Sequence, residues 1–190
     1  MNEPSLPDLL EALGELFLVP GAFDRPRFEA LGRSSWVGLG ITPALQGLII
    51  EDTSGLNVAY TGLFLQGARG PTLHLQASAQ FTGALADPER AADLASIAAV
   101  VRIQPDPGVQ PDHLGAMLIL LAHILRAVAA MEGKRAACLE GAAVDLLQKH
   151  LQPLAERVAA GLEPVDVHPF YRAAGRLLTR SLQLATRVLS

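Results

Sequence analysis

The chain has 190 residues, of which 50% are hydrophobic, 18% are charged and 5% are aromatic, and its formal net charge is −4. A half-apolar chain of this length argues against intrinsic disorder, and the acidic balance argues against the basic face of a nucleic-acid-binding protein. Leu and Ala outnumber β-branched and aromatic residues, so the composition favours an all-α fold.

Start and stop signals predict a series of helices in the first third of the chain. Ser5 is a suitable cap for an opening helix with a broad leucine face, and Pro20-Gly21 ends it. Pro26 fits the first turn of a short helix, and Thr42-Pro43 is typical of a cap followed by an N1 proline. The expected helices lie between residues 5 and 20, 25 and 31, 42 and 51, and 54 and 66, with Gly67 as a C′ residue.

Residues 67–86 show the least regular pattern. Gly70-Pro71 marks a turn, and residues 72–81 alternate partly like a strand. Because a lone strand would have no partner, we expect a loop with a short helix. Asp87-Pro88-Glu89 then starts a helix with a cap, an N1 proline and an acidic first turn. We expect its buried face to hold Ala91, Leu94, Ile97, Ala98 and Val101.

A rigid segment, Gln104-Pro105-Asp106-Pro107-Gly108-Val109-Gln110-Pro111, leads into Asp112-His113-Leu114. Its three prolines are incompatible with a helix, and a long helix of about residues 112–131 follows that is apolar nearly all round. Asp112 and His113 thus stand where a stiff loop meets a helix N-terminus, a place that often carries function. Further helices are expected at about 135–151, with Pro153 starting or kinking a stretch to 158, and from Pro169 onward, after a loop at 161–167.

These elements predict a compact bundle of eight or more helices. The stiff linker at 104–111 divides the chain into an N-terminal half, 1–103, and a C-terminal half, 112–190, which we expect to pack as one domain. The linker would also permit an exchange of halves between two chains, so both a monomer and a hinge-exchanged dimer stay open.

The location predicted from the sequence is cytoplasmic. Residues 1–5 show neither a basic flank nor an apolar run, so we expect no secretory signal. The most apolar stretch, 114–131, contains His123 and Arg126 and is short for a membrane span, so a buried helix is expected rather than stable membrane insertion.

Motifs of enzymes and cofactor sites are absent from the sequence. The five histidines include no pair at i, i+4 spacing, and no nucleophile elbow, phosphate loop or dinucleotide fingerprint occurs. The single Cys138 cannot form a disulfide framework or a zinc cluster, and its apolar neighbours predict a buried structural thiol. We therefore expect no enzyme, no cofactor and no metal.

Asp112 and His113 allow two interpretations. An Asp at a helix start commonly caps a free N–H group, which stabilises a helix by ~0.5–2 kcal/mol. A protonated His at the same end would face the positive end of the helix dipole, so a neutral His113 that bonds a loop carbonyl or a partner is favoured.

The order of several short motifs resembles the TorD/DmsD/NarJ-type redox-enzyme maturation chaperones. Gln110-Pro111-Asp112-His113-Leu114 is similar to a motif of that family that precedes a long apolar helix. Gln110 replaces its usual Glu, Gln76 stands where an aromatic residue is frequent, and the Trp common after His-Leu is missing near Pro153. The other similar segments are 13–20, 60–64, 76–81, 147–151 and 170–174.

This resemblance implies a TorD-like bundle and a chaperone that is not an enzyme. Such proteins bind the twin-arginine signal peptide, or N-terminus, of the apo-form of a molybdenum-cofactor oxidoreductase subunit and delay its export until the cofactor is inserted. A receptor for such a peptide needs carboxylates for its arginines and an apolar groove for its apolar segment.

We expect Asp112 to meet a partner arginine, with His113 beside it as donor or acceptor. The other expected peptide-binding residues are Pro111, Gln110, Leu114, Ser78, Tyr60 and Phe64, although Phe64 and Leu114 fit plain core packing at least as well. Two other classes stay open: a helical ligand-binding or adaptor domain, and a hydrolase using Asp112 and His113, for which no nucleophile is visible. The client reductase is not specified by the sequence.

Overall fold

The computed structural model describes residues 4–19, 23–33, 36, 40–66, 72–84, 86–103, 108–164 and 166–190. Its helices are α1 (Leu6–Leu18), α2 (Arg25–Gly32), α3 (Ile41–Ile50), α4 (Leu56–Tyr60), α5 (Ala77–Thr82), α6 (Pro88–Val100), α7 (Leu114–Ala129), α8 (Gly133–Asp145), α9 (Gln152–Leu162) and α10 (Pro169–Val188). Two π-helical segments, η1 (Thr61–Leu65) and η2 (Leu146–Leu151), continue α4 and join α8 to α9. The all-α prediction is confirmed.

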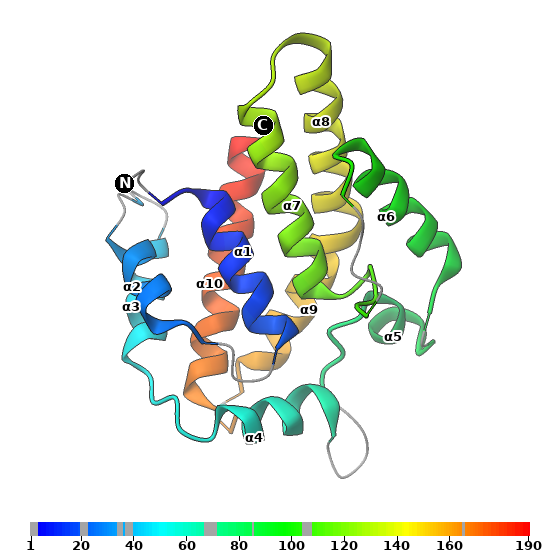
Figure 1. Cartoon of the computed structure of the whole chain (residues 1–190). Helices are drawn as coiled ribbons and strands as arrows, with labels where there is room; N and C mark the ends of the chain where they lie inside the picture. The colour runs from blue at the N-terminus through cyan, green and yellow to red at the C-terminus, as the bar shows by residue number, and fades with distance from the viewer. Residues whose placement is uncertain are drawn as a thin grey trace.

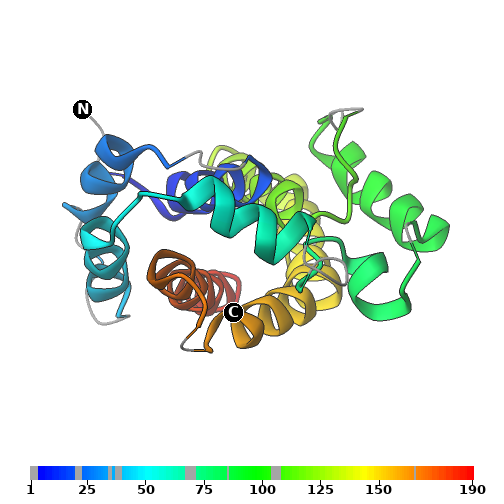
Figure 2. The same cartoon turned by 90° about the horizontal axis from the view of Figure 1, so that it is seen from below.

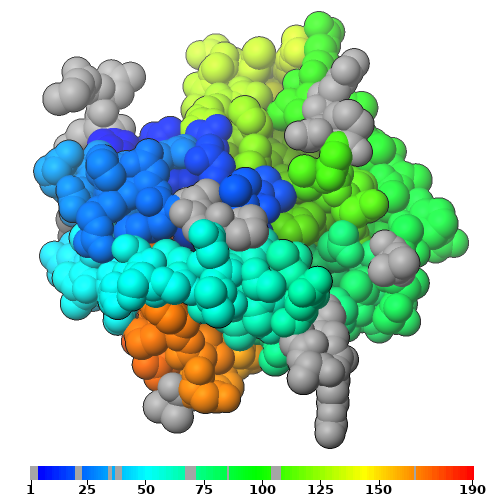
Figure 3. Space-filling model, turned by 60° about the horizontal axis from the view of Figure 1, so that its bottom comes forward, coloured from blue at the N-terminus to red at the C-terminus, as the bar shows by residue number. Residues whose placement is uncertain are grey.

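The helices surround a central group formed by α1, α7 and α10 (Figure 1). Helices α2 and α3 cover one flank, and α5 and α6 form the opposite flank (Figures 1 and 2). Helix α4 and η1 lie across the lower end and form its outer layer (Figure 3). The flanking position of α5 and α6 matters because these helices, together with α7, form the candidate site.

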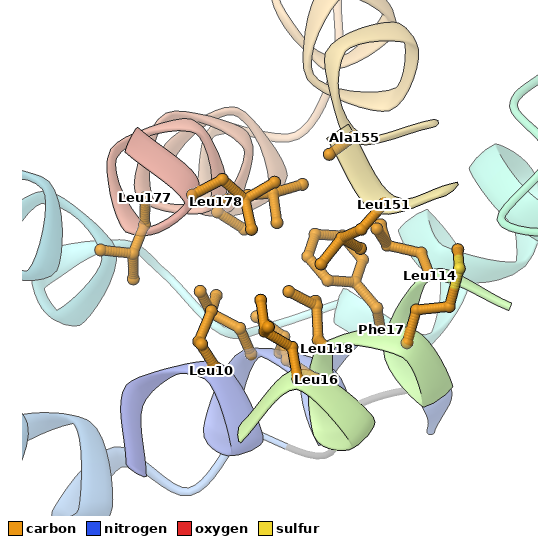
Figure 4. Close-up of a cluster of buried hydrophobic side chains, with 14 of the residues drawn as sticks. Leu10, Leu16, Phe17, Leu114, Leu118, Leu151, Ala155, Leu177 and Leu178 are labelled. Carbon is orange, nitrogen blue, oxygen red and sulfur yellow. The ribbon is translucent and has the colours of Figure 1, made fainter. Parts of the chain in front are cut away.

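One hydrophobic core joins the two predicted halves of the chain. Buried leucines of α1, α7, η2 and α10 point toward one another (Figure 4). Those labelled in the figure, with Phe17 and Ala155, are Leu10, Leu16, Leu114, Leu118, Leu151, Leu177 and Leu178. The boundary at 104–111 therefore does not divide the core. Residues 104–107 lie outside the described residues, so the hinge stays a prediction.

Helices α1 and α7 approach each other through a pair of glycines. A Cβ atom added to Gly115 would lie 2.5 Å from the carbonyl oxygen of Gly14, and one added to Gly14 would lie 2.8 Å from the carbonyl oxygen of Gly115. Both distances are far below van der Waals contact, so the absence of side chains allows the two backbones to touch. This contact fixes α7 against α1.

Most helix starts agree with the sequence signals, and one differs. The cap of α3 is Gly40, with φ of 67°, instead of Thr42, because a glycine in the left-handed region lets the helix begin earlier. Pro153 lies in the first turn of α9, as predicted, and the preceding η2 gives the wider turn that a proline without an N–H group requires. The turn signals at Pro20-Gly21, Gly67 and Gly70-Pro71 lie outside the described residues.

The prediction of a buried thiol is wrong, because Cys138 is exposed on α8. The inward face of this helix is set by Leu139 and Ala143, which are four residues apart. Cys138 lies off that stripe although its sequence neighbours are apolar. Among the described residues, none of the helices is both long and apolar enough to span a bilayer.

Candidate functional site

The Asp112 side chain joins α5 to the start of α7. It is 5% exposed, and its Oδ2 atom accepts hydrogen bonds from the Ser78 N–H at 2.7 Å and the Ser78 hydroxyl at 2.6 Å. The Asp112 carbonyl accepts the Ala77 N–H at 3.0 Å. Asp112 therefore satisfies the first two N–H groups of α5, so its capping function serves a helix distant in sequence and not α7.

His113 is the N-cap residue of α7. Its Nδ1 atom accepts the Gly115 N–H at 3.1 Å. Burial lowers the pKa of His113 from 6.5 to about 4, against the opposing effect of the Asp112 carboxylate. The imidazole is therefore neutral near pH 7, as its place at a helix N-terminus requires.

Backbone contacts complete this junction. Gln76 and His113 form an isolated antiparallel bridge, and the Leu114 N–H donates to the Leu75 carbonyl at 2.7 Å. We call residues 75–78 and 112–115 the α5–α7 corner. It fixes the start of α7 relative to the short helix before α6.

An apolar groove of about 320 Å³ begins beside this corner and runs between α6 and α7. Pro111 lines it next to the corner, and Leu18 contributes from the C-terminal end of α1. We call it the α6–α7 groove; its lining residues are Leu18, Leu94, Ala98, Ile103, Val109, Pro111, Ala116, Ile119, Leu120 and His123. Its volume lies within the range of about 300–1,000 Å³ that is typical of ligand pockets.

A carboxylate of α1, Glu11, lies near the groove, and Glu15 follows one turn later in the helix. Glu11 accepts a hydrogen bond from Arg126 at 2.7 Å, and Glu15 from Arg27 at 2.5 Å. The Arg126 hydrogen bond, and more weakly the charge of His123, lower the pKa of Glu11. Because His123 also lines the groove, the Glu11 carboxylate lies near one end of the apolar groove.

A comparison with protein families assigns the chain to a family. Residues 43–160, more than half of the chain, match the model of the nitrate reductase delta subunit family. The chain belongs to this family. Members of the nitrate reductase delta subunit family are maturation chaperones of molybdoenzymes and not catalytic enzymes, and membership implies interaction with a nitrate-reductase-type molybdoenzyme subunit. No curated protein and no solved structure matches the chain.

The residues predicted from the sequence fall into two groups in this family member. The structure brings Asp112, His113 and Ser78 together in the corner, with Pro111 and the exposed Gln110 next to it. The other three predicted residues, Tyr60, Phe64 and Leu114, are buried at 2%, 5% and 0% exposure.

The side chains of this buried group belong to the hydrophobic core and do not line the groove. The Tyr60 hydroxyl donates to the Phe17 carbonyl at 2.7 Å, and burial raises the pKa of Tyr60 to about 12. Phe64 packs edge-on against Phe17. As placed, these side chains support the bundle, and their contact with a peptide stays a prediction.

The groove lining of α7 was missed by sequence reasoning. Ala116, Ile119 and Leu120 line the groove from α7, and Ile119 lies at its edge, where it also contacts Gly14 of α1. The signal was present, because α7 is apolar nearly all round, but that pattern is equally typical of a helix that is fully enclosed.

Proposed function

We propose that this protein binds the N-terminal twin-arginine leader of the apo-form of a nitrate-reductase-type molybdoenzyme subunit in the cytoplasm. Binding would keep the subunit from export until its cofactor is inserted. The observation that carries the proposal is the α6–α7 groove, which is apolar and adjoins both the corner and the Glu11 carboxylate of α1.

The groove fits the apolar part of such a leader. Its walls are aliphatic except for His123, and burying a Leu or Val side chain there stabilises a complex by about 1.5–3 kcal/mol relative to leaving it in water. A leader that lies in the groove brings its cationic part to one of the two groove ends, the corner or the His123 end.

The cationic part has an acidic partner, Glu11, at the His123 end. Glu15 lies one turn farther along α1, has a side chain that is 48% exposed, and pairs only with Arg27 among the described residues. A second guanidinium group can bind the same carboxylate, because a carboxylate has about four lone-pair sites. Glu15 and Glu11 are thus candidates in addition to Asp112.

Asp112 has two possible contributions, which can be separated. Its Oδ2 is already bonded to Ser78, so a contact with a leader arginine would add to or replace these bonds. If Asp112 only holds the corner, Ser78→Ala and Asp112→Asn weaken leader binding by similar factors. If Asp112 pairs with the leader, Asp112→Asn weakens it strongly and Ser78→Ala only slightly.

Calorimetry with a synthetic leader of the client subunit tests the groove. Leu120→Glu places a carboxylate in the apolar lining and should weaken binding at least about tenfold, since a charge that enters an apolar site without a partner is costly. Val58→Glu is the matched control, because Val58 is 77% exposed on α4 and lies outside the groove. Equal affinities of Leu120→Glu and the unchanged protein would exclude this groove, and a loss on Val58→Glu would move the site to α4.

A further inference from the structure

Helix α10 carries a basic face that the proposed leader site does not use. Its twenty residues include four arginines and no Asp or Glu. Arg176, Arg180 and Arg187 are exposed, and Arg172 is half-buried. Because the whole chain has a net charge of −4, this face is a local segregation of charge and not a general excess.

A second groove, of about 460 Å³, lies between this face and α3. Small residues from both helices leave it open, and Arg176 and Arg180 line it together with Thr179 and Gln183. We call it the α3–α10 groove; its other lining residues are Gly40, Pro43, Ala44, Gly47, Glu163 and Ala173. Helix α3 is on the flank opposite to α6, so the two grooves are apart (Figures 1 and 2).

The arginines of this groove are poorly neutralised. Arg176 approaches Glu163 only to 3.9 Å, with both side chains about 60% exposed, whereas Arg126 lies 2.7 Å from Glu11. Arg180 donates to the Gln183 amide oxygen at 3.1 Å and forms no ion pair within the described part of the chain.

The position of Arg180 adds to this imbalance. Its Nε atom lies 3.5 Å from where a Cβ atom on Gly40 would be, and Gly40 is the N-cap of α3. A cation at a helix N-terminus meets the positive end of the dipole, which is unfavourable. A bound anion would reduce the repulsion between Arg180 and the helix dipole. It would also give the groove arginines an ion-pair partner.

We propose that the α3–α10 groove binds an extended acidic segment of a partner protein, with carboxylates at alternate positions that pair with Arg176 and Arg180. Two residues four apart on a helix are separated by about 6 Å along its axis. Side chains on one face of an extended chain are about 6.6–6.8 Å apart, so an acidic-x-acidic sequence matches this spacing. The guanidinium fork binds carboxylates in bidentate fashion, which favours such a ligand.

The shape of the site favours an extended peptide. Gly40 and Gly47 line the groove opposite the arginines of α10 and carry no side chains, so a peptide backbone can approach α3 closely there. An extended chain can lie along the groove and contact these residues and the arginines together. This proposal is independent of the leader site.

Fluorescence anisotropy with a labelled peptide of alternating Glu and Val tests the proposal. The control is the same peptide with every Glu replaced by Gln, which removes the negative charges. We expect the Glu peptide alone to bind, and the double variant Arg176→Glu/Arg180→Glu to weaken it about tenfold. Gly47→Gln should also weaken peptide binding, without a change of charge, because the added side chain would fill the groove. A Cβ atom at Gly47 meets nothing within 4 Å, so the fold should tolerate the change.

Two controls decide the interpretation. Arg135→Glu reverses an exposed charge of α8 outside the groove and should leave binding unchanged. Circular dichroism of each variant verifies that the helices are retained. Equal losses on Arg135→Glu, no effect of Gly47→Gln, or stronger binding to anionic phospholipid vesicles or duplex DNA than to the Glu peptide would each overturn the proposal.

Discussion

The two sides of α7 differ in how closely a neighbouring helix approaches. On one side, Gly14 and Gly115 let the backbones of α1 and α7 touch. On the other side, aliphatic side chains of α6 and α7 face each other across the α6–α7 groove and leave about 320 Å³ unfilled. Helix α7 is therefore held rigidly on the side that contacts α1 and offers a binding surface on the side of the groove. A rigid, preorganised surface pays a smaller entropy cost when a ligand binds.

The largest effect is expected from adjacent substitutions on the two sides. Gly115→Ala places a methyl group 2.5 Å from the Gly14 carbonyl oxygen and should destabilise the fold by about 3 kcal/mol. Ala116→Leu points into the groove and should change stability by less than about 1 kcal/mol while it weakens leader binding. Urea unfolding measures both variants.

Gly141→Ala controls for helix propensity. Gly141 is exposed in α8, where an added Cβ atom meets nothing within 4 Å, so the change should stabilise the fold by about 0.5–1 kcal/mol. If Gly115→Ala were as well tolerated as Gly141→Ala, the close contact between α1 and α7 would not exist. The two sides of α7 would then not differ in how closely a helix packs against them.

A smaller effect is expected at the N-terminus of α7, where pH tests the corner. The pKa of His113 is about 4 in the folded protein and about 6.5 in an unfolded chain, so the unfolded chain binds the proton first as the pH falls. The His113 contribution is complete above about pH 6.5 and declines as the pH falls, with a loss of about 2–3 kcal/mol by pH 4.

His113→Asn isolates this contribution. Asn is a good N-cap residue and does not titrate, so its variant should lose less stability between pH 6.5 and 4 than the unchanged protein. Thermal unfolding across this pH range provides the measurement. Parallel curves for the two proteins would mean that His113 is not buried as a neutral cap.

Within the corner, a smaller loss of stability is expected for the hydroxyl of Ser78 than for the titration of His113. Ser78→Ala removes one of two hydrogen bonds to Asp112 and leaves the backbone bond, so it should destabilise the fold by about 1–2 kcal/mol. A double-mutant cycle with Asp112→Asn should show coupling, because the two side chains share this bond. Additive effects would mean that the Ser78 hydroxyl and the Asp112 carboxylate do not interact.

Local signals predicted the helices well because their causes are local. Asp87 accepts the Arg90 N–H at the start of α6, and Pro169 lies in the first turn of α10, as their sequence patterns indicate. The pairing of Asp112 with Ser78 could not be predicted in the same way. It depends on how α5 is placed against α7, although both residues were candidates for the site.

The groove escaped prediction for a related reason. Periodicity assigns a face to a helix but does not say how near the next helix lies, and Ile119 is apolar whether it is covered or not. Cys138 shows the converse error, because apolar neighbours in sequence were taken as a sign of burial. Exposure depends on the position around the helix axis and on what packs there.

Photo-crosslinking of the leader tests the central claim most directly. A synthetic client leader with photo-leucine in its apolar segment is bound to the protein, irradiated and mapped by mass spectrometry. The account predicts crosslinks to α6 and α7 at residues such as Leu94, Ile119 and Leu120. Crosslinks concentrated on α4 or in the α3–α10 groove, with none on α6 or α7, would contradict it.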